Sequence, residues 1–367
     1  MDKLKTIKDL IALASYNTND NTKIIDYLVQ RFSPFSKEII KVKNPTNNKY
    51  NLIVGINTSV NNTNAIVLSG HIDTVVADEQ AYNTCPTQAT IINGKIYGLG
   101  VIDMKCFFAS IIDNLEFLSN CNYPIIVVIT CDEETDLLGI NTVVKTLQTK
   151  NVKPCISIIG EPTNMTLCNT SKSCYEYILK VTGKSCHSSN PLNGINANYI
   201  IAKLVCKIEE LNNKYLNTTL SCGIINGGEK ANIVPYFSTA TFDIRSDNKQ
   251  TVDIIIAELN KEISVLTKQY KGCTIELVNI LAIPALENKP NKLINQIVNK
   301  FNLNITEFVG GCEAGYLQQL GGEAFIFGTG DLALAHKPNE FMIIKDFEKY
   351  NKLFCEIIEY ICTIVKH

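Results

Sequence analysis

The feature that most constrains the fold is a series of short, continuous apolar runs separated by segments with apolar residues at helical spacing. Residues 104–118 and a segment ending near 149 have the helical spacing. Strands that alternate with helices in this way predict an α/β domain with a mostly parallel central sheet. Four apolar runs predict the strands of that sheet, and the second, a continuous run, is of the kind buried on both faces: residues 51–57 (NLIVGIN), 65–70 (AIVLSG), 124–131 (PIIVVITC) and 155–160 (CISIIG).

The middle of the chain follows a different order, β-α-β-β-α-β, which is that of the ferredoxin-like split unit. We therefore predict two domains: residues 1–168 with 281–367, and an inserted domain at 169–280. After the insertion the α/β pattern resumes with helices near 290–302, 314–320 and 345–365 and a strand in EAFIFG. Within the insertion the expected elements are a strand at 174–183, a helix at 197–211, two strands within 220–245, a helix at 250–268 and a strand at 273–280.

Composition argues against several classes of partner. The chain has 367 residues and a formal charge of -2, and its scattered lysines form no basic stripe, so no nucleic acid is expected. Charges interrupt the first fifteen residues, which predicts an amphipathic helix and no signal peptide, and no run is long enough to span a membrane. Fourteen cysteines without a CxxC motif do not resemble a secreted disulfide framework, so a cytoplasmic location is expected.

Histidines and carboxylates follow the predicted strands. In an open α/β sheet, ligands collect beyond the carboxyl ends of the strands, so side chains at these positions are expected to converge. One residue at a helix start and one in a later loop are expected at the same edge of the sheet. The residues concerned are His71, Glu133, Glu134 and Glu161 after strands, Asp103 before the helix at 104–118, and His336 in the loop after the last strand.

This set of ligands suits two divalent cations. Such a pair, about 3.5–4 Å apart, needs a bridging carboxylate together with terminal histidine and carboxylate ligands. Asp103 is the predicted bridge, His71 and Glu161 would hold one cation, and Glu134 and His336 would hold the other.

Two acidic residues are left for other roles. Asp73 is expected to accept the second ring N–H of His71 and so fix its tautomer. Glu133 would act as the general base toward water and later carry the proton to the leaving amine.

Taken singly, these residues have ordinary explanations. His71 could be a hydrogen-bonded structural histidine, and Asp103 could be the N-cap of its helix. The Glu133–Glu134 pair could be a solvated helix start, and Glu161 before Pro162 could be a turn residue. The convergence of six such residues on one edge favours a two-metal hydrolase.

The chain resembles the M20 metallopeptidases, also called the aminoacylase or acetylornithine deacetylase family, from about residue 60 to about 345. The matching motifs, in the family's order, are SGHIDTV, GLGVIDMKCFFAS, ITCDEE, IIGEPTN, HSSNP, GGEKANIVP, FDIR and AHKPNE. The resemblance implies a zinc-peptidase-like catalytic domain with two zinc ions per subunit and a ferredoxin-like lid that forms a homodimer. Cobalt or manganese would also suit the ligands.

The acetylornithine deacetylase branch is the most similar, through GEPT, HSSNP and the DMK segment. This implies hydrolysis of N-acetylornithine to ornithine and acetate, a step of arginine biosynthesis. Succinyl-diaminopimelate desuccinylation, acetylcitrulline deacetylation and exopeptidase cleavage remain open, as does a catalytically silent binding or scaffold protein. The chain departs from the branch at Leu99 and Cys106, where arginine and glycine are usual, and neither is a ligand position.

The resemblance also implies roles for residues outside the metal cluster. His187 matches the lid histidine that reaches the active site of the other subunit and steadies the oxyanion. Asn232 and Arg245 match lid residues that contact the substrate, Glu313 is a candidate to meet a cationic substrate amine, and Lys172 is a further candidate contact.

Two of these assignments have alternatives. His187 could serve only the turn formed by the residues after it, and Arg245 could pair with Asp243 or Asp247. A substrate carboxylate would suit the planar guanidinium of Arg245 equally well.

Overall fold

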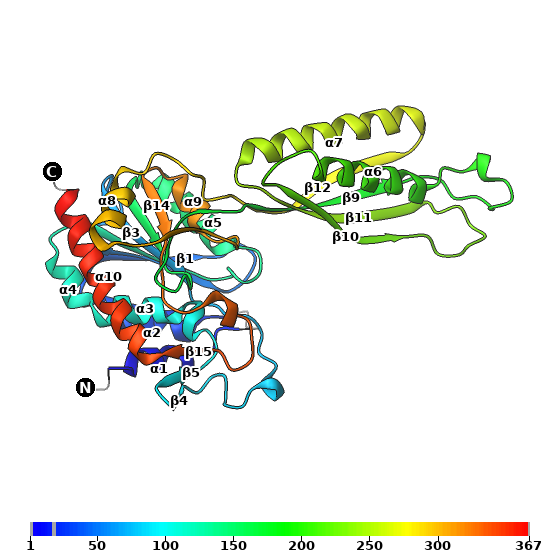
Figure 1. The fold of residues 1–367 in the computed structure, drawn as a ribbon. Helices are drawn as coiled ribbons and strands as arrows, with labels where there is room; N and C mark the ends of the chain where they lie inside the picture. Colours follow the sequence, from blue (N-terminus) through cyan, green and yellow to red (C-terminus); the bar gives the residue numbers. More distant parts are fainter. Residues whose placement is uncertain (1–2, 17–19, 366–367) are drawn as a thin grey trace. The chain divides into compact units, whose positions relative to one another are not determined.

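The computed structural model describes residues 3–16 and 20–365, which divide into two compact units. Unit 1 runs to Thr170 and resumes at Asn288–Phe308 and Cys312, and unit 2 comprises Ser171–Glu287 with Val309–Gly311. An inserted second unit is therefore present, with limits a few residues later than predicted. Figure 1 shows the elements of each unit.

A mixed sheet forms the centre of unit 1 (Figure 1). Its middle strands run parallel, pairing β6 with β3, β3 with β7 and β7 with β14, whereas β1–β2 and β2–β6 are antiparallel. The mostly parallel sheet predicted from the apolar runs is confirmed. In spatial order the strands are β1 (Ser36–Lys43), β2 (Tyr50–Ile56), β6 (Ile125–Thr130), β3 (Ala65–His71), β7 (Pro154–Ile159), β14 (Glu323–Ile326), β8 (Leu167–Ser171) and β13 (Ile305–Phe308).

The central strands are mostly apolar because helices cover both of their faces. Leu68 packs in one core with Phe107 and Phe354, which lie on two of the helices. Val67 and Val128, which point to the opposite face, are equally buried. All seven residues of β3 and all six of β6 are buried, so these strands show no alternation of buried and exposed residues.

The helices of unit 1 mostly lie where helical spacing predicts them. One prediction is wrong: the helix expected over 104–118 is two helices, α3 and α4, separated at Asn114, and they follow a π-helical turn at Val101–Lys105. The helices are α1 (Lys5–Ala12), α2 (Thr22–Phe32), α3 (Cys106–Asp113), α4 (Leu115–Asn120), α5 (Leu138–Thr149), α8 (Lys292–Phe301), α9 (Ala314–Gln318) and α10 (Ile344–Ile364).

A small antiparallel sheet lies beside the turn that carries Asp103. It is formed by β15 (Phe341–Ile343), β5 (Lys95–Tyr97) and β4 (Thr90–Ile92). The structure also has short 3-10 turns, two in unit 1 at Glu79–Ala81 and Leu332–Leu334 and one in unit 2 at Pro191–Asn193.

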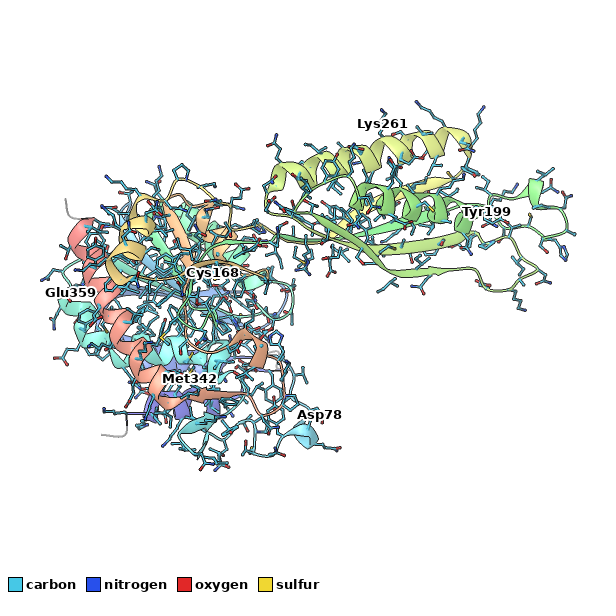
Figure 2. All side chains as sticks on the ribbon, in the orientation of Figure 1. Asp78, Cys168, Tyr199, Lys261, Met342 and Glu359 are labelled. Atoms are coloured by element: carbon cyan, nitrogen blue, oxygen red, sulfur yellow. The ribbon has the colours of Figure 1, made fainter. Side chains whose placement is uncertain are left out.

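Unit 2 is a four-stranded antiparallel sheet with two helices. Its strands lie in the order β10-β11-β9-β12, and the predicted β-α-β-β-α-β order of elements is present. The side chains of Tyr199 and Lys261, labelled in Figure 2, are exposed on its two helices. The elements are β9 (Cys174–Thr182), α6 (Ala197–Asn212), β10 (Thr219–Gly227), β11 (Phe237–Arg245), α7 (Lys249–Gln269) and β12 (Thr274–Ile283).

Among the residues that the structure describes, none of the helices combines the length and apolar character that crossing a membrane requires.

Candidate metal centre

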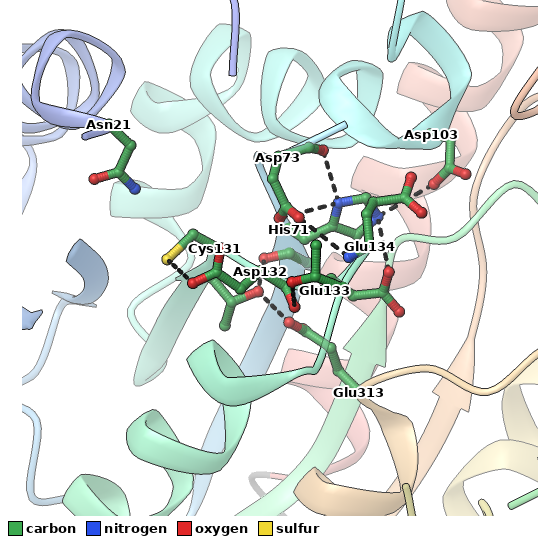
Figure 3. A network of polar contacts seen from close by, with 12 residues as sticks. Asn21, His71, Asp73, Asp103, Cys131, Asp132, Glu133, Glu134 and Glu313 are labelled. Atoms are coloured by element: carbon green, nitrogen blue, oxygen red, sulfur yellow. Dashed lines mark hydrogen bonds and ion pairs between the residues drawn. The ribbon is translucent and has the colours of Figure 1, made fainter. Parts of the chain in front are cut away.

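The parallel strands bring three groups of polar residues to one edge of the sheet. His71 is the last residue of β3, and Glu161 lies two residues beyond β7. Glu133 and Glu134 occupy the turn between β6 and α5, since α5 begins only at Leu138. The ordinary explanation of the glutamate pair as a helix start is therefore wrong, and the pair lies at the predicted edge of the sheet. Figure 3 shows Glu133 and Glu134 close to His71.

Asp103 reaches the same edge from the π-helical turn before α3. Its backbone is extended, with φ -122° and ψ 85°, and none of the described side chains caps α3, which begins at Cys106. The ordinary explanation of Asp103 as a helix N-cap is thus wrong. Its carboxylate is free to point at the histidines.

One group of possible ligands consists of His71, Asp103 and Glu161. His71 Nε2 lies 3.2 Å from Asp103 Oδ1 and 4.0 Å from Glu161 Oε1. All three residues are buried, and one ligand atom from each lies within 4.8 Å of the others. The three could hold one cation.

A second group consists of Asp103, Glu134 and His336. His336 Nε2 lies 3.1 Å from Asp103 Oδ2 and 3.0 Å from Glu134 Oε1. Asp103 therefore uses one carboxylate oxygen toward each histidine, which is the arrangement required of a bridging ligand. The two groups together match the ligand sets predicted from the sequence.

Glu133 belongs to neither of the two groups that share Asp103, although its carboxylate also lies close enough to His71 and Glu134 to form a third possible group with them. Its Oε2 lies 4.0 Å from His71 Nε2, and its side chain is 12% exposed. Burial raises the pKa of Glu133 well above its usual range, and the neighbouring carboxylates of Glu161 and Glu134 add to this effect. A raised carboxyl pKa in a site that water can reach suits a residue that accepts and returns a proton.

Asp73 differs from its predicted role in one respect. His71 Nδ1 lies 3.0 Å from the main-chain carbonyl oxygen of Asp73 and 3.7 Å from its Oδ1, so the carbonyl accepts the ring N–H. The tautomer is still fixed by Asp73, and Nε2 is left for a cation. The carboxylate itself accepts the backbone N–H of Glu134 through Oδ2 at 3.1 Å.

The charges of the cluster favour added cations. Hydrogen bonds with Asp103 and Glu134 raise the pKa of His336 to about 10. Burial alone would lower the pKa of His71, but Asp103, Glu133 and Glu161 outweigh it and raise that pKa well above its usual range.

Two buried carboxylate oxygens support the same conclusion. Glu161 Oε1 and Asp73 Oδ1 have no hydrogen-bond partner among the described residues. Glu161 Oε1 lies within the first group of ligands, and an unpartnered buried carboxylate oxygen is costly unless a cation or water satisfies it. The residues present therefore fit a pair of divalent metal ions.

Glu313 occupies a place different from the one expected. It has no exposed surface, its Oε2 accepts a hydrogen bond from Ser69 Oγ at 2.7 Å, and its Oε1 accepts one from the hydroxyl of Thr130. A carboxylate held inside the sheet in this way cannot meet a substrate amine without displacing both hydroxyls. The predicted substrate contact at Glu313 is not supported.

The other predicted substrate contacts belong to unit 2. His187 and Asn232 are exposed and lie on adjacent segments, with Ser188 N donating to Asn232 O at 3.1 Å. The ring of His187 contacts Ser189 Oγ at 2.7 Å. Lys172 donates to Asn217 O at 3.1 Å.

Arg245 pairs with its neighbour in this structure. Its Nε donates to both carboxylate oxygens of Asp243, at 3.0 and 2.9 Å, as the alternative explanation proposed. Cys174, Glu176 and Asp243 also lie close enough to hold a cation, but the Arg245 guanidinium already neutralises this acidic group.

Sequence reasoning gave no role to two buried acids next to the ligands. Glu340 accepts the backbone N–H groups of Gly100, Ile102 and Asp103, and burial raises its pKa to about 8. Asp132, which is 3% exposed, is bound by side chains of the turn between β1 and β2. Their motifs, AHKPNE and ITCDEE, are visible in the sequence, but the backbone and side-chain groups that bind these two acids are not.

Two ligand groups joined by Asp103, at the carboxyl edge of a mostly parallel sheet, define a metal-dependent hydrolase. Comparison with known proteins is in agreement. The model of peptidase family M20/M25/M40 matches residues 67–360, and the chain belongs to this family.

Individual relatives cover nearly the whole chain. The chain is 31% identical over 377 residues to acetylornithine deacetylase of Buchnera aphidicola subsp. Schizaphis graminum (strain Sg), covering 98% of this chain and 97% of that protein. Its fold is similar to a tripeptidase of Staphylococcus aureus (TM-score 0.79, 21% identity, 98% of each chain). It is also similar to a dinuclear metal-binding M20 peptidase of Bacillus subtilis (TM-score 0.71, 13% identity, 98% and 97% of the chains).

Proposed function

We propose that this protein is a di-zinc amidohydrolase that removes an acetyl group from the α-amine of a small amino acid, with N-acetylornithine as the substrate. Its place would then be arginine biosynthesis in the cytoplasm. The observation that carries the proposal is the double contact of Asp103, one oxygen toward His71 and the other toward His336. The 31% identity to an acetylornithine deacetylase over nearly the full chain supports the choice of substrate.

His71, Asp103 and Glu161 would hold one zinc ion, and Asp103, Glu134 and His336 the other. Zinc bound there would polarise the amide carbonyl and lower the pKa of attacking water toward 7.

Glu133 supplies the proton transfers in this proposal. Its carboxylate takes the proton of the attacking water, and then delivers that proton to the amine as the C–N bond breaks. Burial and acidic neighbours raise the pKa of Glu133 above that of an ordinary carboxylate, which favours its uptake and return of a proton. Asp73 keeps the His71 ring in one tautomer and holds the backbone of Glu134.

We assign unit 2 the role of a ferredoxin-like lid through which two copies form a homodimer. His187 would stabilise the oxyanion in the partner's site, and Asn232, Arg245 and Lys172 would contact the substrate. For Arg245 this role requires the guanidinium to leave Asp243 or to share it with a substrate carboxylate.

A substrate panel tests the proposal. Purified protein with measured metal content is assayed on N-acetylornithine, N-acetylcitrulline, N-succinyl-diaminopimelate and dipeptides. We expect the highest kcat/KM for N-acetylornithine and two zinc ions per chain. A clear preference for the succinyl compound or for dipeptides would overturn the substrate assignment. Absence of turnover on every compound with both zinc ions bound would favour a binding or scaffold protein.

A further inference from the structure

The turn that carries Glu133 and Glu134 is held by a buried polar network. Asp132, the residue before Glu133, accepts hydrogen bonds through Oδ2 from Asn44 Nδ2 at 2.6 Å and from Asn47 Nδ2 at 2.9 Å. Both asparagines belong to the turn between β1 and β2. Figure 3 shows Asp132 beside Cys131 and close to the two glutamates.

A lysine from the same turn completes the network. Lys49 Nζ donates to Asp132 Oδ1, and the side chains of this ion pair are only 13% and 4% exposed. Burial opposes the charge of Lys49, but the hydrogen bond with Asp132 and the nearby charges of Asp132 and Asp73 together outweigh it and raise the pKa of this lysine. Lys49 therefore keeps its positive charge at neutral pH, facing Asp132.

The network also holds the main chain on both sides of Asp132. Cys131 N donates to Asn51 Oδ1 at 3.0 Å, and Asn51 in turn donates to Asn44 Oδ1 at 2.7 Å. On the other side, Leu137 N donates to the carbonyl oxygen of Asp132 at 2.8 Å. The turn from 131 to 137 is thus anchored at its start by side chains and closed by its own backbone.

Asp132 has a backbone conformation that few residues adopt. Its φ is 64°, in the left-handed region, where asparagine, aspartate and glycine are the residues best tolerated. A turn that needed only this conformation would be satisfied by asparagine or glycine. The negative charge of Asp132 has a further role, because its carboxylate accepts hydrogen bonds from Lys49 and from two asparagine amide groups.

We propose that Asp132 is a positioning residue that acts through the turn it opens. Bound to Lys49 and the β1–β2 turn, it would direct the Glu133 carboxylate at the substrate and the Glu134 carboxylate at its metal. Asp73 holds the same turn from the other side through Glu134 N. The inference rests on the proposed function, since it assumes that Glu133 is the general base.

A purely structural role explains the network less well. The desolvation of two charges largely offsets their attraction, so a buried ion pair is weak evidence for a contribution to stability. Orientation of the next two side chains has a larger effect, because a displacement of about 1 Å at a catalytic group can lower turnover about 100-fold.

Two substitutions test the proposal. Asp132→Asn keeps the size of the side chain and a residue type that accepts positive φ, but it removes the charge that Lys49 binds. Lys49→Met removes the ammonium group and keeps the length of the side chain. We expect each to lower kcat about 10–100-fold with KM changed less than about threefold and with two metal ions still bound. The double variant should lose no more than the worse single variant, because the two residues act as one unit.

Lys41→Met is the matched control. Lys41 lies on β1 and pairs with Asp26 at 2.9 Å, but this pair is exposed at 44% and 61%, so its loss should leave kcat unchanged. Should Asp132→Asn not fold, Lys49→Met carries the same test. A kcat within about threefold of the unmodified protein in both variants, or a loss of activity equal in the control, would overturn the proposal.

A second measurement does not depend on the substrate. The amide hydrogens of Glu134 and Leu137 are hydrogen-bonded in this structure, so their exchange reports the order of the turn. We expect Asp132→Asn to speed their exchange at least about tenfold, and Lys41→Met to leave it unchanged. If the unmodified protein hydrolyses none of the panel but this result holds, the proposed function fails and the positioning of the turn stands. Unchanged exchange in Asp132→Asn would contradict the positioning itself.

Discussion

Oε2 of Glu313 accepts a hydrogen bond from Ser69 Oγ at 2.7 Å, two residues before His71, the candidate metal ligand at the end of β3. The carboxylate has no exposed surface, and burial raises its pKa above the usual range. Its second oxygen is bound by Thr130, the residue of β6 that pairs with His71. Glu313 therefore joins the two strands whose ends carry the candidate ligands.

Removal of this carboxylate should destabilise the fold. In Glu313→Ala, Ser69 loses its acceptor, whereas Thr130 keeps the carbonyl oxygen of Gly70 at 3.0 Å. We expect the free energy of unfolding to fall by about 1–3 kcal/mol, measured by urea denaturation. Glu359→Ala, on the exposed face of α10 and labelled in Figure 2, is the control and should change it by less than about 0.5 kcal/mol. Equal stability of the two variants would contradict the described role of Glu313.

Glu133→Gln should abolish proton transfer without emptying the metal site. The amide has the size of the carboxylate but cannot accept the proton of water, so kcat should fall about 100- to 10,000-fold. Metal content, measured by mass spectrometry on the same sample, should be unchanged because Glu133 lies outside the two groups that share Asp103. A variant that retains full activity would show that another residue is the base.

Substitution of single ligands should separate the two metal positions. His336→Ala and Glu161→Ala each remove a residue from one group only, so each should lower the bound metal from two ions toward one. Asp103→Ala removes the residue shared by both groups and should lower the affinity for both ions. Metal content after dialysis against a weak chelator measures this difference. If Asp103→Ala lost no more metal than His336→Ala, Asp103 would not be a bridge.

Metal affinity should rise with pH. His336 has a pKa of about 10 in the metal-free protein, and the ring must lose its proton before it can bind a cation. Each proton released makes the affinity rise about tenfold per pH unit below that pKa.

The stability of the metal-free protein should change with pH in the opposite direction and fall as pH rises. The proton on His336 stabilises the fold fully below pH 6.5, and this contribution is lost as pH rises through about 10. Competition titrations with a chelator between pH 6 and 8 measure the affinity, and thermal unfolding of the metal-free protein measures the stability. An affinity that did not change with pH would contradict the protonated state of His336.

The main part of the fold and of the ligand set was predictable from the sequence. Continuous apolar runs such as 65–70 indicate strands buried on both faces, and parallel strands end at a common edge. Polar residues directly after such runs, such as His71 and Glu161, are therefore brought together by the sheet alone. No long-range contact has to be known to predict this.

The remaining details depend on tertiary contacts that periodicity does not encode. Asp103 has the sequence signature of an N-cap, but the buried Glu340 binds the backbone of its turn and α3 begins three residues later. The carbonyl group of Asp73, and not its carboxylate, accepts the ring N–H of His71. Glu313 lies inside the sheet because two hydroxyl groups on neighbouring strands receive it.

The most direct test of the central claim is the anomalous diffraction of zinc in crystals of the metal-loaded protein. The account predicts two peaks about 3.5–4 Å apart, one bound by His71, Asp103 and Glu161 and the other by Asp103, Glu134 and His336. A single peak, or peaks that Asp103 does not join, would contradict it.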